Sequence, residues 1–566
     1  MDLKLSCFFD VLVAGSGIAG LSAAREAAAS GCRTAILSET HLFSGSSFYP
    51  GTWGFGLVGP EDESDVEDMI ATVNRMGCQM ADPDLVRTFV SGINPAISHL
   101  ESMGCHPKKA AKSSEREYIP CFDHKHRNWN GLEADSLRRT FSKQLKEQNV
   151  TILDHCTILE VVKEEGRVCG AIVSCNNELQ YIGCHALILA TGGYGSLFYS
   201  HLCTDDVSGL GHFLALKAGC RLVNMEFMQM MPGYLYPARN TIFNEKTFRF
   251  ATFRTSGHTP LFSDDEKALL DLRSTYGPFT SRLPSHVIDL KLYQASLEDE
   301  NGVEVSYAEA AKNDPPEFIK IYFDWLSSEK HVSVNDTIHI GMFSHAANGG
   351  ILIDADGFTG INGLYACGEV TGGMHGADRV GGLSTANGLV FGQRAGRAAA
   401  AAASQTAAFD SRISTPNPQA AAFDSQAAAL NLQTSASGLP PAALAFPCHE
   451  IADRAGIRSE LQKYMYRNAM VIRNECGLLD TKVKLEQMLS DIHWSPSADA
   501  AAITDSLILE GQLMTALCIL KAALLRRESR GSHYRSDFPT ENPEMASPIE
   551  ISLDHGITAA FKNPPL

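Results

Sequence analysis

The chain has 566 residues, of which 44% are hydrophobic and 20% charged, and its formal net charge is −18 at pH 7. This length predicts two to four domains, since a single hydrophobic core stops growing at about 250 to 300 residues. The acidic balance argues against nucleic-acid binding, which needs a surface rich in Lys and Arg, and the lack of a polybasic run argues against binding to a membrane surface.

From the sequence we expect neither a targeting signal nor a metal site. No apolar run reaches the length that we expect of a membrane-spanning helix, and the first four residues lack the basic region of a signal peptide. The 15 cysteines are scattered, odd in number and without a Cys-x-x-Cys pair. This pattern favours reduced thiols in a cytoplasmic protein over disulfides, and it predicts no zinc or iron–sulfur site. We interpret His124 and His126 as part of a solvated loop, because no further ligand follows at metal-site spacing.

The first elements along the chain form a nucleotide-binding pattern. Residues 10–14 are predicted as a short buried strand, 21–30 as a helix that ends at Gly31, and 33–37 as a second strand. The turn between the first strand and the helix reads Gly-Ser-Gly-Ile-Ala-Gly. A glycine motif in this strand–turn–helix–strand context is a much stronger signal than the same motif alone.

Each glycine of this turn has a physical role in binding a dinucleotide. Gly15 permits the tight turn, Gly17 lets the backbone approach a pyrophosphate, and Gly20 lets the helix pack closely on the strand. The amino end of the helix would face the phosphates with its partial positive charge. By itself the motif leaves open whether the cofactor is FAD or NAD.

The rest of the chain changes character several times. Residues 60–150 alternate helices with polar loops, whereas 150–153 and 168–173 are predicted strands. A buried strand over 186–190 ends in a second glycine turn, Thr191-Gly192-Gly193. In residues 231–342 this succession of strands and glycine turns stops, and we interpret the segment as a separate insert.

The C-terminal part combines a return to strands with helices. Residues 351–368 resume strands and turns, and a helix is predicted over 384–403. Residues 398–447 are rich in Ala, Gln, Ser and Pro, which is typical of a linker or loop, although parts could form an Ala-rich helix. A further helix is predicted over 503–527, with Gly531 as its stop.

Several motifs follow one another in a fixed order along the chain. They are Gly15-x-Gly-x-x-Gly20, Gly45-Ser46-Ser47-Phe48-Tyr49, Ala190-Thr191-Gly192-Gly193, Met225-Glu226-Phe227-Met228-Gln229, His345 before Gly349-Gly350, Gly368-Glu369-Val370, His375-Gly376-Ala377-Asp378-Arg379 and Arg527-Glu528-Ser529-Arg530-Gly531. With these motifs the chain resembles the flavoprotein subunit family of fumarate reductase, succinate dehydrogenase and L-aspartate oxidase. The resemblance covers nearly all of the chain except the Ala-rich stretch.

The resemblance implies an α/β fold. We expect a Rossmann-like FAD-binding domain with an inserted α+β capping domain and a C-terminal helical domain. The FAD-binding domain would have two parts, and the predicted boundaries are 1–230 for its first part, 231–342 for the capping domain, 343–400 for its second part, 401–447 for an Ala-rich linker or insertion and 448–566 for the helical domain.

The resemblance also implies FAD as the cofactor. Family members that attach FAD covalently carry a His in the segment that reads Ser44-Gly45-Ser46-Ser47 here, so FAD is expected to be non-covalent. Glu369 would bind one ribose, and either Ser38 or Glu39 would meet the other. The expected cofactor-binding residues are Gly15, Ser16, Gly17, Ala19, Gly20, Ser38, Glu39, Ser46, Ser47, Gly51, Val161, Ala190, Thr191, Gly192, Gly193, Glu369 and Ser384.

The substrate site implied by the resemblance is built from cations. Arg379 matches the carboxylate clamp of the family, where a guanidinium forks onto two carboxylate oxygens. His345 matches a second carboxylate ligand. The proton donor of the family is an arginine in the cap, which we align with Arg282, and Arg254 is the rival candidate. Arg379, His345 and Arg282 are the expected catalytic residues.

Two departures from the family pattern bear on the substrate. The family has a histidine before the proline of the Met-Glu-Phe-x-Gln segment, whereas Met231 precedes Pro232 here. The Thr-Glu pair of the family is also missing, with Phe250-Ala251 aligned in its place. Met231, together with His345, Arg379 and Arg254, would therefore line a substrate site in which half of the usual dicarboxylate ligands are apolar. We expect a substrate with one carboxylate and a bulkier or less polar second end.

These observations predict an FAD-dependent oxidoreductase that transfers a hydride between flavin N5 and the carbon next to a carboxylate, with a substrate other than plain fumarate. Three alternatives stay open: an L-aspartate-oxidase-like amino-acid oxidase, a flavoprotein electron-transfer subunit of a larger redox complex, and a family member without catalysis. The expected partners are a small carboxylic acid and an electron-donor protein or iron–sulfur subunit, because the chain itself carries no iron–sulfur or haem motif.

Overall fold

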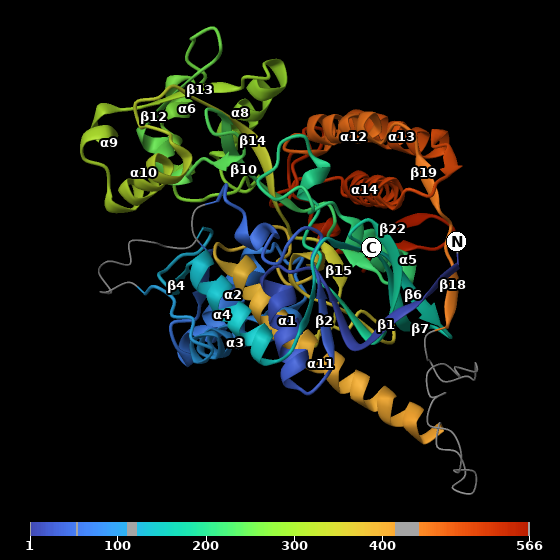
Figure 1. Ribbon diagram of the computed structural model, residues 1–566. Helices are drawn as coiled ribbons and strands as arrows, with labels where there is room; N and C mark the ends of the chain where they lie inside the picture. The colour runs from blue at the N-terminus through green and yellow to red at the C-terminus, as the bar shows by residue number, and fades with distance from the viewer. Residues whose placement is uncertain (1, 53–54, 110–120, 414–440, 564–566) are drawn as a thin grey trace, which may run out of the picture.

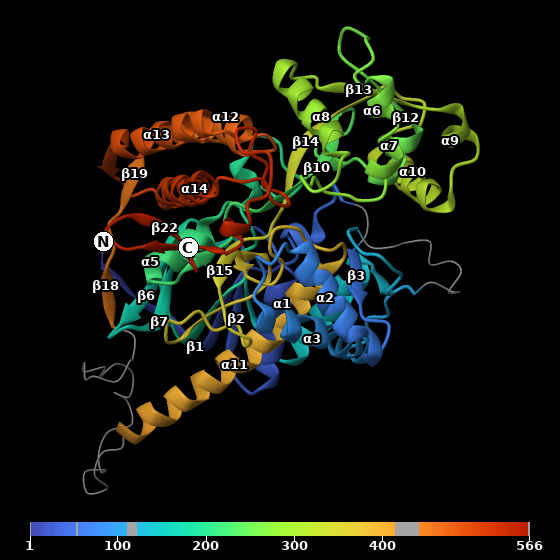
Figure 2. The same cartoon turned by 180° about the vertical axis from the view of Figure 1, so that it is seen from behind.

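The structure, a computed structural model, describes residues 2–52, 55–109, 121–413 and 441–563 (Figure 1). The expected α/β architecture is confirmed: a mixed sheet with helices forms the centre, a separate lobe lies to one side, and helices of the C-terminal part pack on the other (Figures 1 and 2).

The central sheet has eight strands and carries the nucleotide-binding pattern. Its order is β5-β2-β1-β8-β7-β6, with β16 paired to β8 and β18 paired to β1. Strands β5, β2, β1, β8 and β16 run parallel, whereas β7 pairs antiparallel with both β8 and β6. The strands are β1 (Asp2–Ala14), β2 (Thr34–Leu37), β5 (Thr151–Leu153), β6 (Cys156–Glu164), β7 (Arg167–Cys175), β8 (Glu178–Leu189), β16 (Leu364–Ala366) and β18 (Ala443–Ala445).

Strand β1 is longer than the sequence pattern predicts. The buried apolar run over 10–14 marks only its carboxyl half, because this half lies between β2 and β8 and is covered on both faces. The amino half pairs with β8 and with β18, which comes from the far end of the chain. Residues 2–6 alternate in exposure and residues 7–9 are partly or fully exposed, so this half is a partly solvated strand.

Helices cover the sheet on the side of the nucleotide turn. Helix α1 packs along α11, and α11 also contacts α3 and β8. A two-stranded antiparallel sheet of β3 and β4, which are separated in the chain by α2 and α3, lies beside them. The bounds are α1 (Ile18–Ala29), α2 (Val66–Met76), α3 (Pro83–Ser102), α4 (Ala134–Glu147), α11 (Leu383–Ile413), β3 (Phe55–Gly59) and β4 (Asn128–Leu132).

Helix α11 extends into the Ala-rich stretch. The sequence predicts an end at residue 403, but the helix continues to Ile413 because its alanines favour helix strongly. Residues 414–440, the centre of the predicted linker, lie outside the described residues. The chain then re-enters the fold at β18, so the two ends of this stretch belong to the same domain as the central sheet.

The lobe set apart from the central sheet is the cap (Figure 1). Its five-stranded sheet has the order β11-β10-β14-β13-β12, and β10 and β14 carry the chain into and out of the lobe as an antiparallel pair. The elements are β10 (Met228–Tyr236), β11 (Thr241–Ile242), β12 (Ala251–Arg254), α6 (Asp264–Lys267), α7 (Leu270–Arg273), α8 (His286–Glu298), β13 (Val303–Tyr307), α9 (Glu309–Asn313), α10 (Glu317–Lys330) and β14 (Ile338–Ala347).

The C-terminal part is helical with two small sheets. Helix α14 lies between α12 and α13 on one side and the final hairpin β21–β22 on the other (Figure 2). That hairpin joins β9, β15 and β17 in a sheet, which ties the end of the chain to the first half. The bounds are α5 (Leu210–Ala218), β9 (Leu222–Val223), β15 (Gly350–Leu352), β17 (Thr371–Gly372), β19 (His449–Ile451), α12 (Arg454–Ala469), α13 (Glu475–Asp491), β20 (Trp494–Pro496), α14 (Ala500–Leu525), β21 (Ile549–Leu553) and β22 (Ile557–Phe561).

Helix α14 contradicts the expectation that no apolar run is long enough to span a membrane. Among the described residues it is the helix whose length and composition would allow it to cross a membrane, with a mean hydropathy of 1.6 over its most apolar window. However, 67% of that window is buried inside the protein. A helix that is hydrophobic on all sides also arises in the core of a large protein, and the packing of α14 between helices and a hairpin is of this kind.

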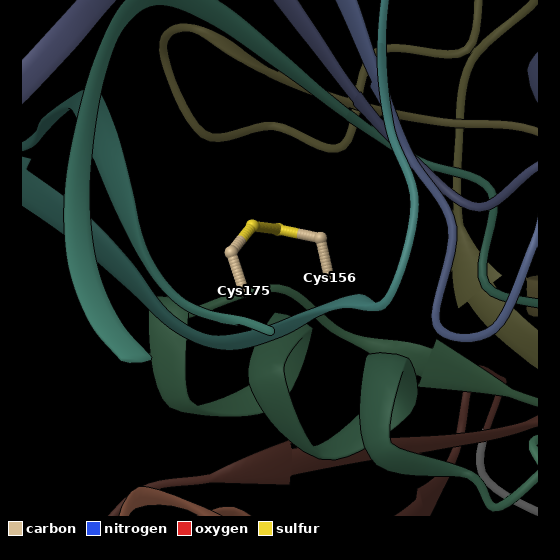
Figure 3. Close-up of a disulfide and its surroundings, with 2 residues drawn as sticks. All are labelled: Cys156 and Cys175. Carbon is tan, nitrogen blue, oxygen red and sulfur yellow. A yellow bond between two sulfur atoms is a disulfide. The ribbon is translucent and has the colours of Figure 1, made fainter. Parts of the chain in front are cut away.

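The expectation of reduced thiols throughout is wrong for one pair of cysteines. Cys156 at the start of β6 and Cys175 at the end of β7 stand directly opposite each other, with Cα atoms 4.1 Å apart, and are joined by a disulfide (Figure 3). The other 13 cysteines form no disulfide. The pair is 19 residues apart in the sequence and becomes adjacent only through the hairpin register, which composition and spacing do not reveal.

Candidate active site

A cavity of about 820 Å³ runs along the carboxyl ends of the parallel strands and reaches the cap. Ala14 and Leu37 at the ends of β1 and β2 line one end, and Met231 and Glu245 of the cap line the other. The carboxyl edge of a parallel sheet is where α/β proteins bind their ligands. The two ends are called below the cradle end and the substrate end.

The glycine turn shapes the cradle end. A Cβ atom on Gly15, whose φ is +113°, would lie 2.2 Å from the carbonyl oxygen of Ala190, and one on Gly20 would lie 1.8 Å from the carbonyl oxygen of Gly15. Side chains are therefore excluded at both positions. Gly17 opens to the cavity instead, since its Cβ would meet only Ser47 Oγ at 3.4 Å. The amino end of α1 thus faces the cavity, where the N–H of Ile18 donates to Ser47 Oγ at 3.1 Å. The partial positive charge of a helix amino end suits an anion site.

Polar side chains at the end of β2 continue the cradle. Ser16 Oγ and Ser38 Oγ lie 2.7 Å apart, and Ser38 Oγ donates to the carbonyl of His41. Burial and, to a lesser extent, the nearby charge of Asp206 raise the pKa of the Glu39 carboxyl to about 8. Both Ser38 and Glu39 line the cavity, so the geometry keeps both as candidates for a ribose hydroxyl.

Glu369 reaches the cavity from a turn after β16. Its Oε1 accepts the backbone N–H of Ala347 at 2.9 Å. Burial raises the pKa of the Glu369 carboxyl, while this hydrogen bond and nearby Arg379 act against the rise. Gly193 makes room for the carboxylate, because a Cβ there would lie 2.4 Å from Glu369 Oε1. An oriented carboxylate at this point can accept hydrogen bonds from two ribose hydroxyls.

Most of the cofactor residues expected from the sequence line the cavity. These are Gly15, Ser16, Gly17, Ala19, Ser38, Glu39, Ser46, Ser47, Ala190, Thr191, Gly192, Glu369 and Ser384. Gly20 and Gly193 stand just behind the wall and leave space for it.

Gly51 and Val161 do not line the cavity. Gly51 packs against the carbonyl oxygen of Asn240 and accepts a hydrogen bond from Ile242 N–H, so it supports the cap. Val161 lies within β6 opposite Ala171, and the wall is formed farther back along the same strand by Cys156, Thr157 and Ile158. No signal in the sequence separates these neighbours within one continuous apolar strand.

Three residues predicted for the substrate come together at the substrate end. Met231 of β10, His345 of β14 and Arg379 all line the cavity. Burial and, to a lesser extent, the nearby charge of Arg379 lower the pKa of His345 to about 3, so the imidazole is neutral. Gln229 Nε2 donates to the carbonyl of Arg379 at 3.0 Å, which holds the backbone at this residue.

Met231 belongs to an apolar wall. It packs in one buried cluster with Leu202 and Phe343, and Ile242 packs against that cluster. Leu202, Met231 and Ile242 all line the cavity. Beside the carboxylate-binding groups, the substrate end therefore offers a surface for an apolar part of a ligand.

The expectation that Phe250-Ala251 replaces an acidic pair at the substrate end is corrected by the structure. Asn244 and Glu245 line the cavity, whereas Phe250 and Ala251 do not. Cys121 Sγ, also on the wall, donates to Glu245 Oε1 at 3.6 Å. Among the described residues Glu245 forms no ion pair. This chain lacks the Arg-Gly-Glu-Gly segment that follows the acidic pair in the family, so no local motif marks Asn244 and Glu245 in the sequence.

Neither predicted proton donor lines the cavity. Arg254 lies exposed at the end of β12 and donates to the carbonyl of His258. Arg282 is half-buried, with Nη1 3.5 Å from Asp378 Oδ2 and 3.4 Å from the sulfur of Met76. A third cap arginine, Arg273, stands behind the wall, where it is fully buried and donates to the carbonyl of Gly277.

Within the described ranges no group of three or more His, Cys, Asp or Glu residues could hold a metal ion. The cavity instead has the features of a dinucleotide site, with a glycine turn that excludes side chains, a helix amino end that faces it and polar side chains where the riboses would lie. These residues fit FAD, and the same cavity also contains Arg379 at the substrate end.

Comparisons with known proteins agree with this geometry. The FAD binding domain model matches residues 10–254 and 283–385, more than half of the chain, and the model for the C-terminal part of fumarate reductase flavoproteins matches residues 458–553. A subunit of the fumarate reductase (CoM/CoB) of Methanothermobacter marburgensis is 28% identical over 96% of this chain and 97% of its own length. L-aspartate oxidase of Mycobacterium bovis is 27% identical over 96% and 95%.

Solved structures share the fold. The Sdh1 complex of Mycobacterium smegmatis with UQ1 superposes with a TM-score of 0.77 at 22% identity, covering 99% of this chain and 95% of that chain. The E. coli quinol fumarate reductase FrdA with the E245Q mutation gives a TM-score of 0.73 at 21% identity, covering 99% and 98%. At these identities the superpositions show a shared fold and give no information on the substrate.

Proposed function

Since the chain belongs to the flavoprotein family of fumarate reductase, succinate dehydrogenase and L-aspartate oxidase and takes FAD as its cofactor, we propose that it transfers a hydride at the carbon next to a substrate carboxylate. The observation that carries the proposal is the meeting of Arg379 and His345 in the cavity that also contains the cradle. Bound FAD supplies the chemistry of hydride acceptance and donation.

The carboxylate would be held by Arg379 and His345. The guanidinium of Arg379 offers a planar fork that matches two carboxylate oxygens, so it sets direction as well as charge. His345 is neutral because of its lowered pKa, and a neutral imidazole can still donate one hydrogen bond. Its Nδ1 has no hydrogen-bond partner among the described residues, which leaves that atom available to a ligand or a water.

The proton at the reacting carbon would be moved by Glu245. Among the titratable side chains of the cap, its carboxylate lies buried on the wall of the substrate end. Arg273, behind Gly277, forms a buried ion pair with Asp289; burial lowers the pKa of the guanidinium, but the charge of Asp289 and, to a lesser extent, that of Glu245 raise it. Glu245 therefore has a cation nearby without a direct ion pair among the described residues. A carboxyl group that alternates between two protonation states beside the substrate carbon meets the requirement for general acid–base catalysis.

The second end of the substrate would be apolar. Leu202, Met231 and Ile242 line the wall near the carboxylate-binding groups, and none of them can donate a hydrogen bond to a second carboxylate. A buried unpaired carboxylate is strongly disfavoured, whereas an apolar group gains free energy from the same surface. An unsaturated monocarboxylate therefore fits better than fumarate.

A second candidate function is the oxidation of an amino acid, and Glu245 favours it. An ammonium group next to the substrate carboxylate would find an acceptor in Glu245, and Arg379 would hold the carboxylate at the other side. The side chain of such an amino acid would lie against Met231 and its neighbours. Glu245 would then take a proton from the ammonium group before the hydride leaves the α-carbon.

Electrons would be exchanged with a partner protein or a soluble carrier. The relative from Methanothermobacter marburgensis is named as one subunit of an enzyme, which supports a partner subunit for this chain as well. No iron–sulfur or haem motif stands in the sequence that could take this role within the chain itself.

The experiment that tests the proposal is anaerobic. The holoenzyme is reduced with dithionite and mixed with fumarate, crotonate or cinnamate, and the visible spectrum of the flavin is followed. In parallel the oxidised holoenzyme is mixed with a panel of amino acids. Rapid reoxidation by a monocarboxylate supports the first function, and reduction by an amino acid supports the second. Reoxidation by fumarate in preference to both monocarboxylates would refute the apolar second end.

A further inference from the structure

A short segment of the cap, residues 279–282, leaves the lobe and contacts two other parts of the protein. Thr280 Oγ1 donates to Asp378 Oδ2 at 2.7 Å, and Arg282 Nη1 lies 3.5 Å from the same oxygen. The backbone N–H and the hydroxyl of Ser281 both donate to the carbonyl of Gly531, at 2.8 and 2.9 Å. Thr280 is fully buried by these contacts.

Asp378 is the residue on which the cap segment converges. It is buried to 1% exposure and directly precedes Arg379 in the chain. Its Oδ2 accepts from the cap, while Oδ1 is buried without a hydrogen-bond partner among the described residues. A buried carboxylate is strongly destabilising unless it is paired, so Asp378 depends on the donors that the cap brings.

The backbone on either side of Asp378 is held by other elements. The carbonyl of Ala377 accepts from Ser532 Oγ at 2.9 Å and from Asn348 Nδ2 at 3.2 Å. The carbonyl of Arg379 accepts from Gln229 Nε2 at 3.0 Å. The backbone is therefore held by hydrogen bonds at Ala377 and at Arg379, and this backbone sets the direction of the Arg379 side chain. The side chain of Asp378, which lies between these two residues, is held by the cap.

We infer that Asp378 is a positioning residue that serves as the catch of the cap: it binds Thr280 and Arg282 when the cap covers the cavity, and by this contact it holds the neighbouring Arg379 in place for the substrate carboxylate. The inference rests on the proposed function only for the role of Arg379. The catch itself is a contact between two domains, and it can be measured without any substrate.

Other contacts between the cap and the rest of the chain act elsewhere. Tyr293 on α8 donates to the carbonyls of Tyr466 and Arg467 on α12. These contacts tie the cap to the C-terminal helices and not to the loop of Arg379. Loss of the Thr280 hydroxyl alone would therefore separate a catch at Asp378 from general attachment of the cap.

The test compares three substitutions in the holoenzyme. Thr280→Val removes the hydroxyl and keeps the shape, and Thr280→Ser keeps the hydroxyl. Thr275→Val is the matched control, because the hydroxyl of Thr275 donates to Leu272 within the cap. Hydrogen–deuterium exchange reads the amide of Ser281, which is bonded across the domain boundary to Gly531. Titration with crotonate, followed through the flavin spectrum, reads the dissociation constant of a monocarboxylate.

For Thr280→Val we expect exchange of the Ser281 amide to be about tenfold faster and the dissociation constant of crotonate to rise about fivefold. Thr280→Ser should restore both, and Thr275→Val should change neither. The catch is refuted if the Ser281 amide exchanges as slowly in Thr280→Val as in Thr275→Val. The positioning of Arg379 is refuted if exchange accelerates while crotonate binding is unchanged. Should crotonate fail to bind the wild-type enzyme, the proposed substrate class fails, and the exchange measurement still decides whether the catch exists.

Discussion

The cradle end and the substrate end of the cavity are built by different means. The cradle end is made mainly of backbone: three glycines within six residues, a helix amino end and the ends of adjacent parallel strands. The substrate end is made of side chains that come from β10, β14, the start of the cap and the loop after β17. A backbone site is encoded locally, whereas a side-chain site depends on the meeting of distant segments. Each end can therefore be disturbed without the other.

The largest effect is expected at the glycine turn. Gly15→Ala adds a Cβ that would lie 2.2 Å from the carbonyl of Ala190, in a conformation with φ of +113° that L side chains rarely adopt. We expect the variant to lose FAD and to be destabilised by more than about 3 kcal/mol. The ratio of flavin to protein absorbance and the midpoint of thermal unfolding measure both effects.

The matched control for this change is Gly166→Ala. Gly166 also has a positive φ, +81°, but a Cβ there would meet nothing within 4 Å. Gly166→Ala should retain FAD and lose only about 1 kcal/mol of stability, which is the cost of placing an L side chain in this backbone conformation. Full flavin content in Gly15→Ala would contradict the view that backbone approach defines the cradle end.

At the substrate end, Arg379→Lys should affect catalysis and leave the cradle intact. Lysine keeps the charge and loses the planar fork. We expect kcat/KM for the substrate found in the anaerobic screen to fall about 100-fold, or about 3 kcal/mol, with unchanged flavin content. Arg254→Lys, on the exposed end of β12, is the control and should behave as wild type. An equal loss in both variants would contradict the placement of Arg379.

A smaller and opposite effect is expected for Met231→His. The substitution adds a hydrogen-bonding group to the apolar wall formed with Leu202 and Phe343. We expect the rate of flavin reoxidation by fumarate, relative to that by crotonate, to rise about tenfold. Met228→His, a buried position of β10 that does not line the cavity, controls for general disturbance of the strand. No change in the ratio would mean that another residue sets the preference.

The two ends should also respond oppositely to pH. The pKa of Glu39 is raised from 4.5 to about 8 by burial and by Asp206, so its contribution to stability is present at low pH and is lost as pH rises toward 8. The pKa of His345 is lowered from 6.5 to about 3, so the folded form resists protonation and stability is lost as pH falls below 6.5. Each effect amounts to about 1.4 kcal/mol per pH unit within its window.

Single variants separate these two contributions in the apoprotein. Glu39→Gln should raise the midpoint of thermal unfolding at pH 8.5 and leave it nearly unchanged at pH 4.5. His345→Gln should reduce the loss of stability between pH 6.5 and pH 5. Thermal unfolding followed by circular dichroism across this range measures both. If the midpoint of thermal unfolding changed with pH in the same way in wild type and in both variants, the directions given for the pKa shifts of Glu39 and His345 would be contradicted.

The family, the cofactor and most of the cradle end could be predicted from the order of residues along the chain. Gly15, Gly17 and Gly20 stand within one strand–turn–helix unit, and Glu369 follows a buried strand, so local spacing places each of them. At the substrate end the same holds for Met231, His345 and Arg379, because these stand in motifs whose order the chain keeps.

The other side chains that reach the cavity are selected by the packing of distant segments. Glu245 and Cys121 face each other from segments more than 120 residues apart, and Arg282, expected in the cavity, pairs with Asp378 instead. The Cys156–Cys175 disulfide depends likewise on the register of one hairpin. Hydrogen bonds within a turn or helix follow from neighbouring residues, but the position of a lobe that is joined to the core by two strands follows from packing across the whole chain.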